Sequence, residues 1–185
     1  MARRRGDARI ARIEDLHGKI VGIINDPGAF DVLEAAGVRW AANRDLAGGR
    51  IVLANLVAYS DQTRIHDCLA DGAVDAFCVD LPIYHWAAND PASPWAGRIE
   101  VVPGNLAADL YYYTAAVAAE PASLSLLGAI NRFIADFLPT PERRAIELRW
   151  QGTVHTSTRC YRDEPGNLIG EAELADRVNR SQTSS

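Results

Sequence analysis

The chain has 185 residues, of which 48% are hydrophobic and 23% charged, and its formal net charge is −5. This length and composition allow a sizeable buried core in one large domain or two small lobes. The acidic balance argues against nucleic acid and anionic membrane surfaces as partners, because both call for a clustered basic face. No apolar run in the sequence approaches the length of a membrane span.

The chain begins with a basic segment, residues 1–12, which carries Arg3, Arg4, Arg5, Arg9 and Arg12. We interpret it as a flexible, solvated leader. The apolar stretch that a secretory signal needs does not follow these arginines, so the chain as written is expected to be cytoplasmic.

The first predicted unit is a strand, a turn and a helix. Residues 20–24 read Ile-Val-Gly-Ile-Ile, a β-branched apolar run typical of a buried parallel strand. Asn25, Asp26, Pro27 and Gly28 follow as a turn, in which Asp26 is a good helix N-cap and Pro27 a good first helical residue. The free amide groups of such a helix start can bind a carboxylate or another anion.

The pattern of strand and helix then repeats. Residues 50–59 are predicted to be a strand, and Ser60 and Asp61 to cap a helix over 62–70 that stops at Gly72. A third strand over 73–79 ends on Asp80. This order predicts a small parallel α/β sheet whose strands end at one functional edge. The candidate site residues at that edge are Asn25, Asp26, Gly28, Ala29, Ser60, Asp61, Gln62 and Asp80.

The second half of the chain is predicted to hold an edge strand over 98–102 and a β-rich segment over 110–117. Apolar residues at three- and four-residue spacings predict an amphipathic helix over 125–138, and a shorter helix is expected over 141–150. Residues 153–185 are polar, and we expect there a weakly packed strand or helix followed by a disordered end.

Three motifs in order resemble the type II periplasmic solute-binding proteins, also known as bacterial extracellular solute-binding protein family 3. Residues 15–22, Asp-Leu-His-Gly-Lys-Ile-Val-Gly, resemble the family's D-L-x-G-K-x-V-G. Residues 69–76, Leu-Ala-Asp-Gly-Ala-Val-Asp-Ala, followed by Asp80, resemble its L-x-x-G-x-V-D-A-x-x-x-D. Ala129-Ile130-Asn131 and the ending Leu148-Arg149-Trp150-Gln151-Gly152 are similar to its closing helix pair. The resemblance covers about residues 13–152.

The resemblance implies two α/β lobes joined by two crossing strands that close over a small polar solute, commonly an amino acid. It implies that Asp80 takes the solute's ammonium group near a hinge and that the backbone at Gly28 and Ala29 takes its carboxylate. It also implies that Ser60, Asp61 and Gln62 line the rim of the second lobe. The implied location is the periplasm, and the implied partner is the permease of an ABC-type importer.

On this reading the chain divides into the leader, a second-lobe α/β unit over 13–81, the hinge and return segments of the first lobe over 82–152, and the polar tail. Most of the first lobe is absent, so the return segments carry apolar faces open to self-association. We expect no catalysis, no cofactor and no metal site.

Two alternatives stay open. Asn25-Asp26-Pro27-Gly28 faintly resembles the first turn of the cyclohexadienyl dehydratases, enzymes of the same fold, in which case a carboxylate such as Asp80 or Asp26 would be the general acid. The chain could instead be a truncated or vestigial lobe that binds nothing. The binding hypothesis predicts an open polar crevice, whereas the vestigial one predicts that Phe30 fills it.

Overall fold

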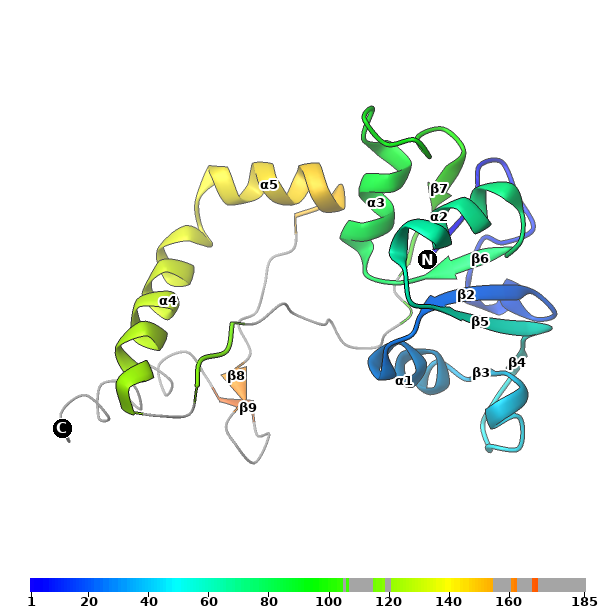
Figure 1. Ribbon diagram of the computed structural model, residues 1–185, viewed down its shortest axis with the longest axis horizontal. Helices are drawn as coiled ribbons and strands as arrows, with labels where there is room; N and C mark the ends of the chain where they lie inside the picture. Colours follow the sequence, from blue (N-terminus) through cyan, green and yellow to red (C-terminus); the bar gives the residue numbers. More distant parts are fainter. Residues whose placement is uncertain (105, 107–114, 119–120, 155–160, 163–167, 170–185) are drawn as a thin grey trace. The chain divides into compact units, whose positions relative to one another are not determined.

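The computed structural model describes residues 1–104, 106, 115–118, 121–154, 161–162 and 168–169 (Figure 1). The chain forms two compact units. The first comprises Met1–Tyr111 with Arg149–Gly152, and the second comprises Tyr112–Leu148 with Thr153–Ser185. The first unit holds every site residue predicted from the sequence.

A five-stranded sheet with the order β5-β2-β6-β1-β7 forms the centre of the first unit. Its strands are β1 (Ala2–Arg4), β2 (Ile20–Ile24), β5 (Asn55–Tyr59), β6 (Ala76–Cys78) and β7 (Ile99–Val101). The central β2 pairs in parallel with β5 and with β6, whereas β1 is antiparallel to both β6 and β7. The architecture is therefore mixed α/β, as the sequence predicted at the level of fold class.

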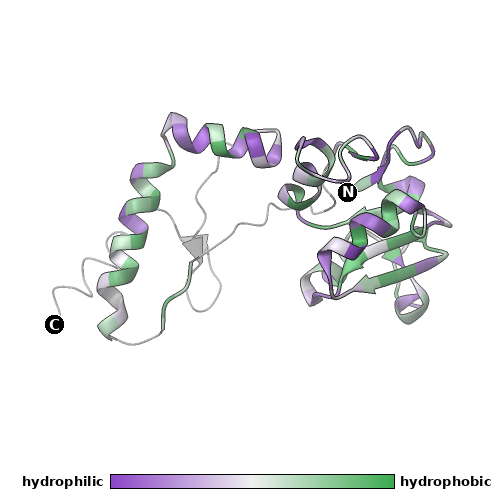
Figure 2. Cartoon of the chain, turned by 45° about the horizontal axis from the view of Figure 1, so that its top comes forward, coloured by the Kyte–Doolittle hydropathy of each residue, from purple (hydrophilic) through white to green (hydrophobic). Residues whose placement is uncertain are grey.

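The strand β2 matches its predicted bounds, and its sequence explains its position. Val21 and Ile23 are fully buried in one core cluster, whereas Ile20 and Ile24 pack against the other. Such alternation is expected of a strand covered on both faces. Gly22 lies so close to Tyr59 that an added Cβ would meet its ring at 3.3 Å. Figure 2 shows hydrophobic residues along the central strands of the sheet, as the sequence Ile-Val-Gly-Ile-Ile of β2 requires.

Helices cover both faces of the sheet (Figure 1). The helix α1 (Pro27–Ala35) contributes Leu33 to the core cluster on one face. On the other face, α2 (Gln62–Asp71) and α3 (Leu81–Asn89) enclose a cluster that includes Leu69 and Tyr84. The unit thus has three layers, with the sheet in the middle.

Some elements are shorter than the sequence predicted. The strand expected over 50–59 is split into β4 (Ile51–Val52) and β5, and β4 pairs in parallel with β3 (Val38–Arg39) in a separate small sheet. The third strand of the prediction is reduced to β6. Two 3₁₀ helices, η1 (Ile13–Leu16) and η2 (Ala41–Asn43), complete this part of the chain. The predicted edge strand is confirmed as β7.

The expectation of a flexible leader over residues 1–12 is wrong. Residues 2–4 form the strand β1 between β6 and β7, and the side chains of Met1, Ala2 and Ile10 are buried. The arginines are paired with acids: Arg3 binds Glu100 at 2.7 Å, and Arg9 binds Asp7 at 2.7 Å. The strands β6 and β7 and the distant Glu100, together with the local Arg9–Asp7 pair, order a segment whose charge alone suggested solvation.

In the second unit, a 3₁₀ turn, η3 (Pro121–Ser123), leads into α4 (Leu124–Phe137). The helix α5 (Pro141–Gln151) follows, and β8 (Tyr161–Arg162) pairs with β9 (Leu168–Ile169). Both predicted helices are confirmed. Of the β-rich segment expected over 110–117, residues 110–114 lie outside the described residues, and 115–117 have no regular structure. Within the described ranges, no helix is long and apolar enough to cross a membrane.

Candidate functional site

The three parallel strands of the sheet end side by side. The last residue of β2, Ile24, lies opposite Tyr59 at the end of β5, and Ile23 lies opposite Cys78 at the end of β6. The amide of Asn25 donates to the carbonyl oxygen of Tyr59 at 2.8 Å, which ties the first two strand ends together. The helices α1, α2 and α3 begin directly after these ends. This carboxyl edge is where open α/β sheets bind ligands.

Asp26 caps α1 as predicted, and in doing so it occupies the backbone donors of the expected anion site. Its carboxylate accepts from the amide of Gly28 at 2.7 Å, and its carbonyl oxygen accepts from the amide of Ala29 at 3.0 Å. The two backbone donors that the resemblance assigned to a solute carboxylate are therefore engaged by Asp26. A solute carboxylate has to displace the Asp26 side chain in order to bind Gly28.

Phe30 turns away from the carboxyl edge. It packs against the core cluster that contains Leu33, and its ring centroid lies 5.9 Å from that of Trp40. Asn25, Asp26 and Gly28, which precede Phe30 in the chain, are exposed. Phe30 does not fill the edge in the way that the vestigial hypothesis predicts.

The second turn, Ser60–Gln62, is exposed along its length. Asp61, rather than Ser60, caps α2, because its carboxylate accepts from the amide of Thr63 at 2.9 Å and from the Thr63 hydroxyl at 2.7 Å. These hydrogen bonds, the hydroxyl first, lower the pKa of Asp61. The group is therefore an anion at neutral pH and faces solvent.

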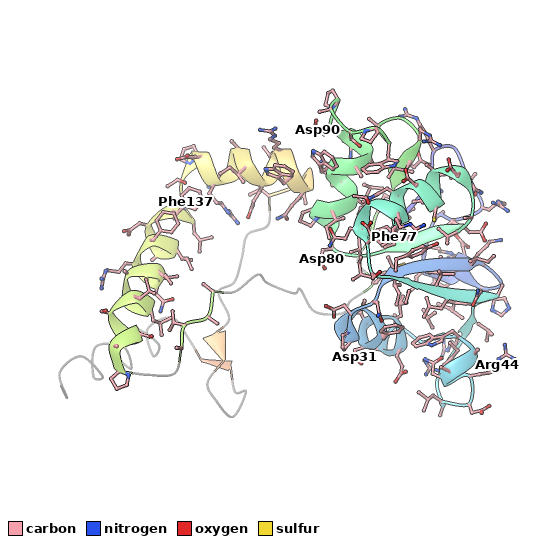
Figure 3. The ribbon with its side chains drawn as sticks, viewed as in Figure 1. Asp31, Arg44, Phe77, Asp80, Asp90 and Phe137 are labelled. Carbon is pink, nitrogen blue, oxygen red and sulfur yellow. The ribbon has the colours of Figure 1, made fainter. Side chains whose placement is uncertain are left out.

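Asp80 occupies the N-cap position of α3 and is exposed, and its side chain makes no capping hydrogen bond to that helix. Burial raises the pKa of Tyr84 on α3, and the charges of Cys78 and Asp80 add to this effect. Asp80 thus differs from Asp26 and Asp61, whose side chains cap their helices. In Figure 3 it lies at the end of the sheet where α1 begins, and Arg44 lies near the opposite end.

The edge also gathers two further segments. Because β1 is antiparallel to its neighbours, Met1 lies at the edge where β7 ends, and the amide of Val102 donates to the carbonyl oxygen of Met1 at 3.0 Å. The backbone nitrogen of Met1 donates to the Tyr84 hydroxyl at 3.0 Å. The strands β1 and β7 therefore meet the edge next to the start of α3.

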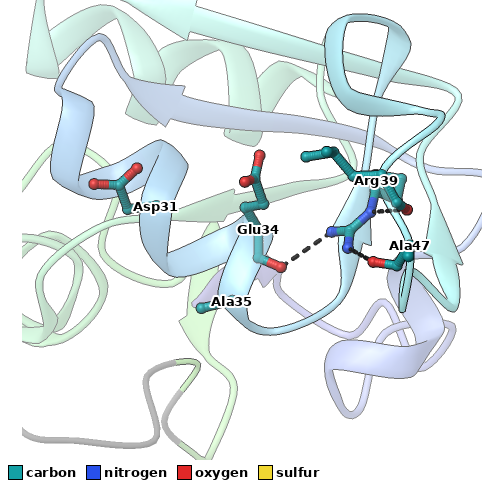
Figure 4. A pocket seen from close by; sticks show the side chains of 6 residues that line it. Asp31, Glu34, Ala35, Arg39 and Ala47 are labelled. Carbon is teal, nitrogen blue, oxygen red and sulfur yellow. Dashed lines mark hydrogen bonds between the residues drawn. The ribbon is translucent and has the colours of Figure 1, made fainter.

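A groove that sequence reasoning missed lies at the other end of α1 (Figure 4). It is lined by Asp31, Glu34, Ala35, Arg39, Leu46 and Ala47. Arg39 is buried, and its guanidinium donates to the carbonyl oxygens of Glu34, Val38, Leu46 and Ala47 at 2.7–3.1 Å. This arginine closes the end of α1 and holds the loop after η2. The sequence signal is Gly49, where any Cβ would overlap the Arg39 side chain.

None of the residues predicted for the site lines this groove. In the part of the chain that the structure describes, no group of three or more His, Cys, Asp or Glu side chains is placed to hold a metal ion.

No protein-family model matches the chain, and no curated protein sequence matches it.

Proposed function

We propose that this chain is a solute-binding protein of the kind that serves ABC-type importers, and that it binds a small polar or amino-acid-like solute without chemistry. The observation that carries the proposal is the convergence of three exposed acids, Asp26, Asp61 and Asp80, on the carboxyl edge of one sheet. The strand order adds support, because β1 and β7 meet that same edge side by side.

The meeting of β1 and β7 at the edge favours a solute-binding protein over a generic α/β domain. In the family that the motifs resemble, two adjacent chain segments cross between lobes beside the solute. Here the Met1–Val102 hydrogen bond places the start of β1 and the end of β7 together at the edge, and the chain continues from Val102 toward the second unit. This geometry suits a lobe that is connected through its ligand-binding edge.

The chemistry of the edge favours the ammonium end of a solute. Asp80 is the residue that we assign to it, because it is exposed at the start of α3, directly after β6, where the motif that resembles the solute-binding family has its acid. A charge-assisted hydrogen bond between an ammonium group and a carboxylate is among the stronger polar contacts available to such a site. A solute carboxylate competes with Asp26 for the amide of Gly28.

A thermal-shift screen of the standard amino acids and small carboxylates tests the proposal. We expect at least one amino acid to raise the melting temperature of the wild-type chain, because a ligand bound only by the folded state stabilises it. Asp80→Asn should abolish the rise. Asp45→Asn, a change at an exposed acid in the loop after η2, should leave it intact. A flat screen, or a rise that survives Asp80→Asn, contradicts the assignment.

A further inference from the structure

One imidazole in the first unit is buried among aromatic side chains. His66 lies on α2, and 3% of its surface is exposed. Neither Nδ1 nor Nε2 has a hydrogen-bond partner in the part of the chain that the structure describes. A neutral ring tolerates this setting, whereas an imidazolium brings a second N–H donor and a charge that need an acceptor.

The ring of His66 packs between aromatic side chains from two other elements. It lies 4.6 Å from the Trp95 ring at an interplanar angle of 31°, and 5.8 Å from Phe77 of β6 in an edge-on contact. Trp95 also donates through Nε1 to the Asp67 carboxylate at 2.8 Å. Trp95 therefore contacts two successive residues of α2.

The segment that carries Trp95 is in turn fixed to α3. The hydroxyl of Ser93 donates to the carbonyl oxygen of Ala87 at 2.7 Å, and the amide of Trp95 donates back to that hydroxyl at 3.2 Å. The Trp86 ring of α3 lies 6.3 Å from the Trp95 ring. The Ser93–Trp95 turn thus joins α2 to α3 through the His66 ring.

The charges around His66 do not compensate for its protonation. From β6 it faces Phe77, from the turn it faces Trp95, and beyond Trp95 lies Trp86. Two groups favour protonation of the ring: the backbone of Gln62, one turn earlier on α2, and the Asp67 carboxylate, which already binds the Trp95 indole. Burial outweighs both groups and lowers the pKa of His66.

We propose that His66 is an acid-sensitive lock. As a neutral ring it holds α2 against β6 and the Ser93–Trp95 turn, and when it takes up a proton it releases that turn. Because α2 begins at the Asp61 turn, acid then loosens the carboxyl edge. This last consequence rests on the proposed function, whereas the lock itself does not.

The size of the effect follows from linkage. A histidine exposed by opening titrates near its ordinary pKa of about 6.5, so the open population grows as pH falls below that value while the closed form stays neutral. Between pH 7.5 and pH 5.0, the open fraction should rise by up to about 30-fold, the limit for a closed form that stays neutral throughout.

Amide hydrogen exchange measures this opening without any ligand, so its failure is distinct from failure of the proposed function. The exchange rates of α2 and the Ser93–Trp95 turn, corrected for intrinsic chemistry, should rise several-fold and up to about 30-fold from pH 7.5 to pH 5.0 in the wild type. In His66→Phe the ratio should fall to near 1. His17→Gln, at an exposed histidine outside α2 and α3, should behave like the wild type.

If the corrected exchange rates of the wild type are the same at pH 5.0 and pH 7.5, the lock is overturned. It is also overturned if the ratio of these two rates is the same in the wild type and in His66→Phe. Since phenylalanine is larger than histidine, His66→Leu provides a second variant that lacks the titrating group, with the same expectation. Quenching of tryptophan fluorescence below pH 6 in the wild type, absent from both His66 variants, should accompany the exchange.

Discussion

The amide of Val102 donates to the carbonyl oxygen of Met1 at 3.0 Å, so the start of β1 and the end of β7 lie together at the edge where the parallel strands end. The same edge carries Asp26, Asp61 and Asp80 at the starts of three helices. The edge thus brings three acids together with Met1 and with Val102, after which the rest of the sequence follows.

The Asp26 side chain stabilises the start of α1 and occupies the amide of Gly28, and Asp26→Ala tests both roles. Asp26→Ala should lower the free energy of unfolding by about 1 kcal/mol through loss of the helix cap. It should also free the amide of Gly28, and a solute that carries a carboxylate should then bind more tightly. Urea denaturation and calorimetric titration of the same variant measure the two quantities. Weaker binding of such solutes would assign Asp26 to the ligand instead.

Arg39 is expected to be a structural residue. Arg39→Ala removes a guanidinium that binds four main-chain carbonyl oxygens, and it should lower the free energy of unfolding by about 2–4 kcal/mol. Arg39→Lys should recover little of that loss, because one ammonium cannot reproduce the planar fork. Arg44→Ala, at an exposed site nearby, is the matched control for urea denaturation. Equal stability of the Arg39 and Arg44 variants would refute this role.

The pairing of Asp7 with Arg9 predicts that the stability of the fold falls at acid pH. The hydrogen bond from the Arg9 guanidinium holds the pKa of Asp7 well below its usual value of 3.8. A carboxyl group with a lowered pKa in the folded state stabilises the fold above its unfolded pKa, and this stabilisation is lost as pH falls toward the folded value. Asp7→Asn should therefore reduce the loss of stability between about pH 5 and pH 3. The midpoint of urea unfolding at several pH values measures it, and parallel curves for wild type and variant would contradict the expectation.

Local patterns explain the parts of the fold that the sequence predicted well. The bounds of β2 follow from a β-branched apolar run, and the cap of α1 follows from Asp26 and Pro27 within the same turn. The end of α2 at Gly72 follows from a left-handed conformation, φ +85°, that glycine readily adopts. Each of these features depends on residues a few positions apart.

Features that depend on distant partners were not predictable in the same way. The strand β1 reads Ala-Arg-Arg, which suggests solvation, and it is ordered by β6, by β7 and by Glu100 far along the chain. The amides of Gly28 and Ala29 seemed available from the turn sequence, yet the conformation of Asp26 engages both. The environment of His66 depends on Trp95, which periodicity on α2 cannot reveal.

Calorimetric titration with the amino acid that gives the largest thermal shift tests the solute-binding account most directly. We predict saturable binding to the wild type, at least tenfold weaker binding to Asp80→Asn through loss of a charge-assisted contact, and unchanged binding to Asp45→Asn. Binding that is equally strong in wild type and Asp80→Asn, or no binding of any amino acid, would contradict it.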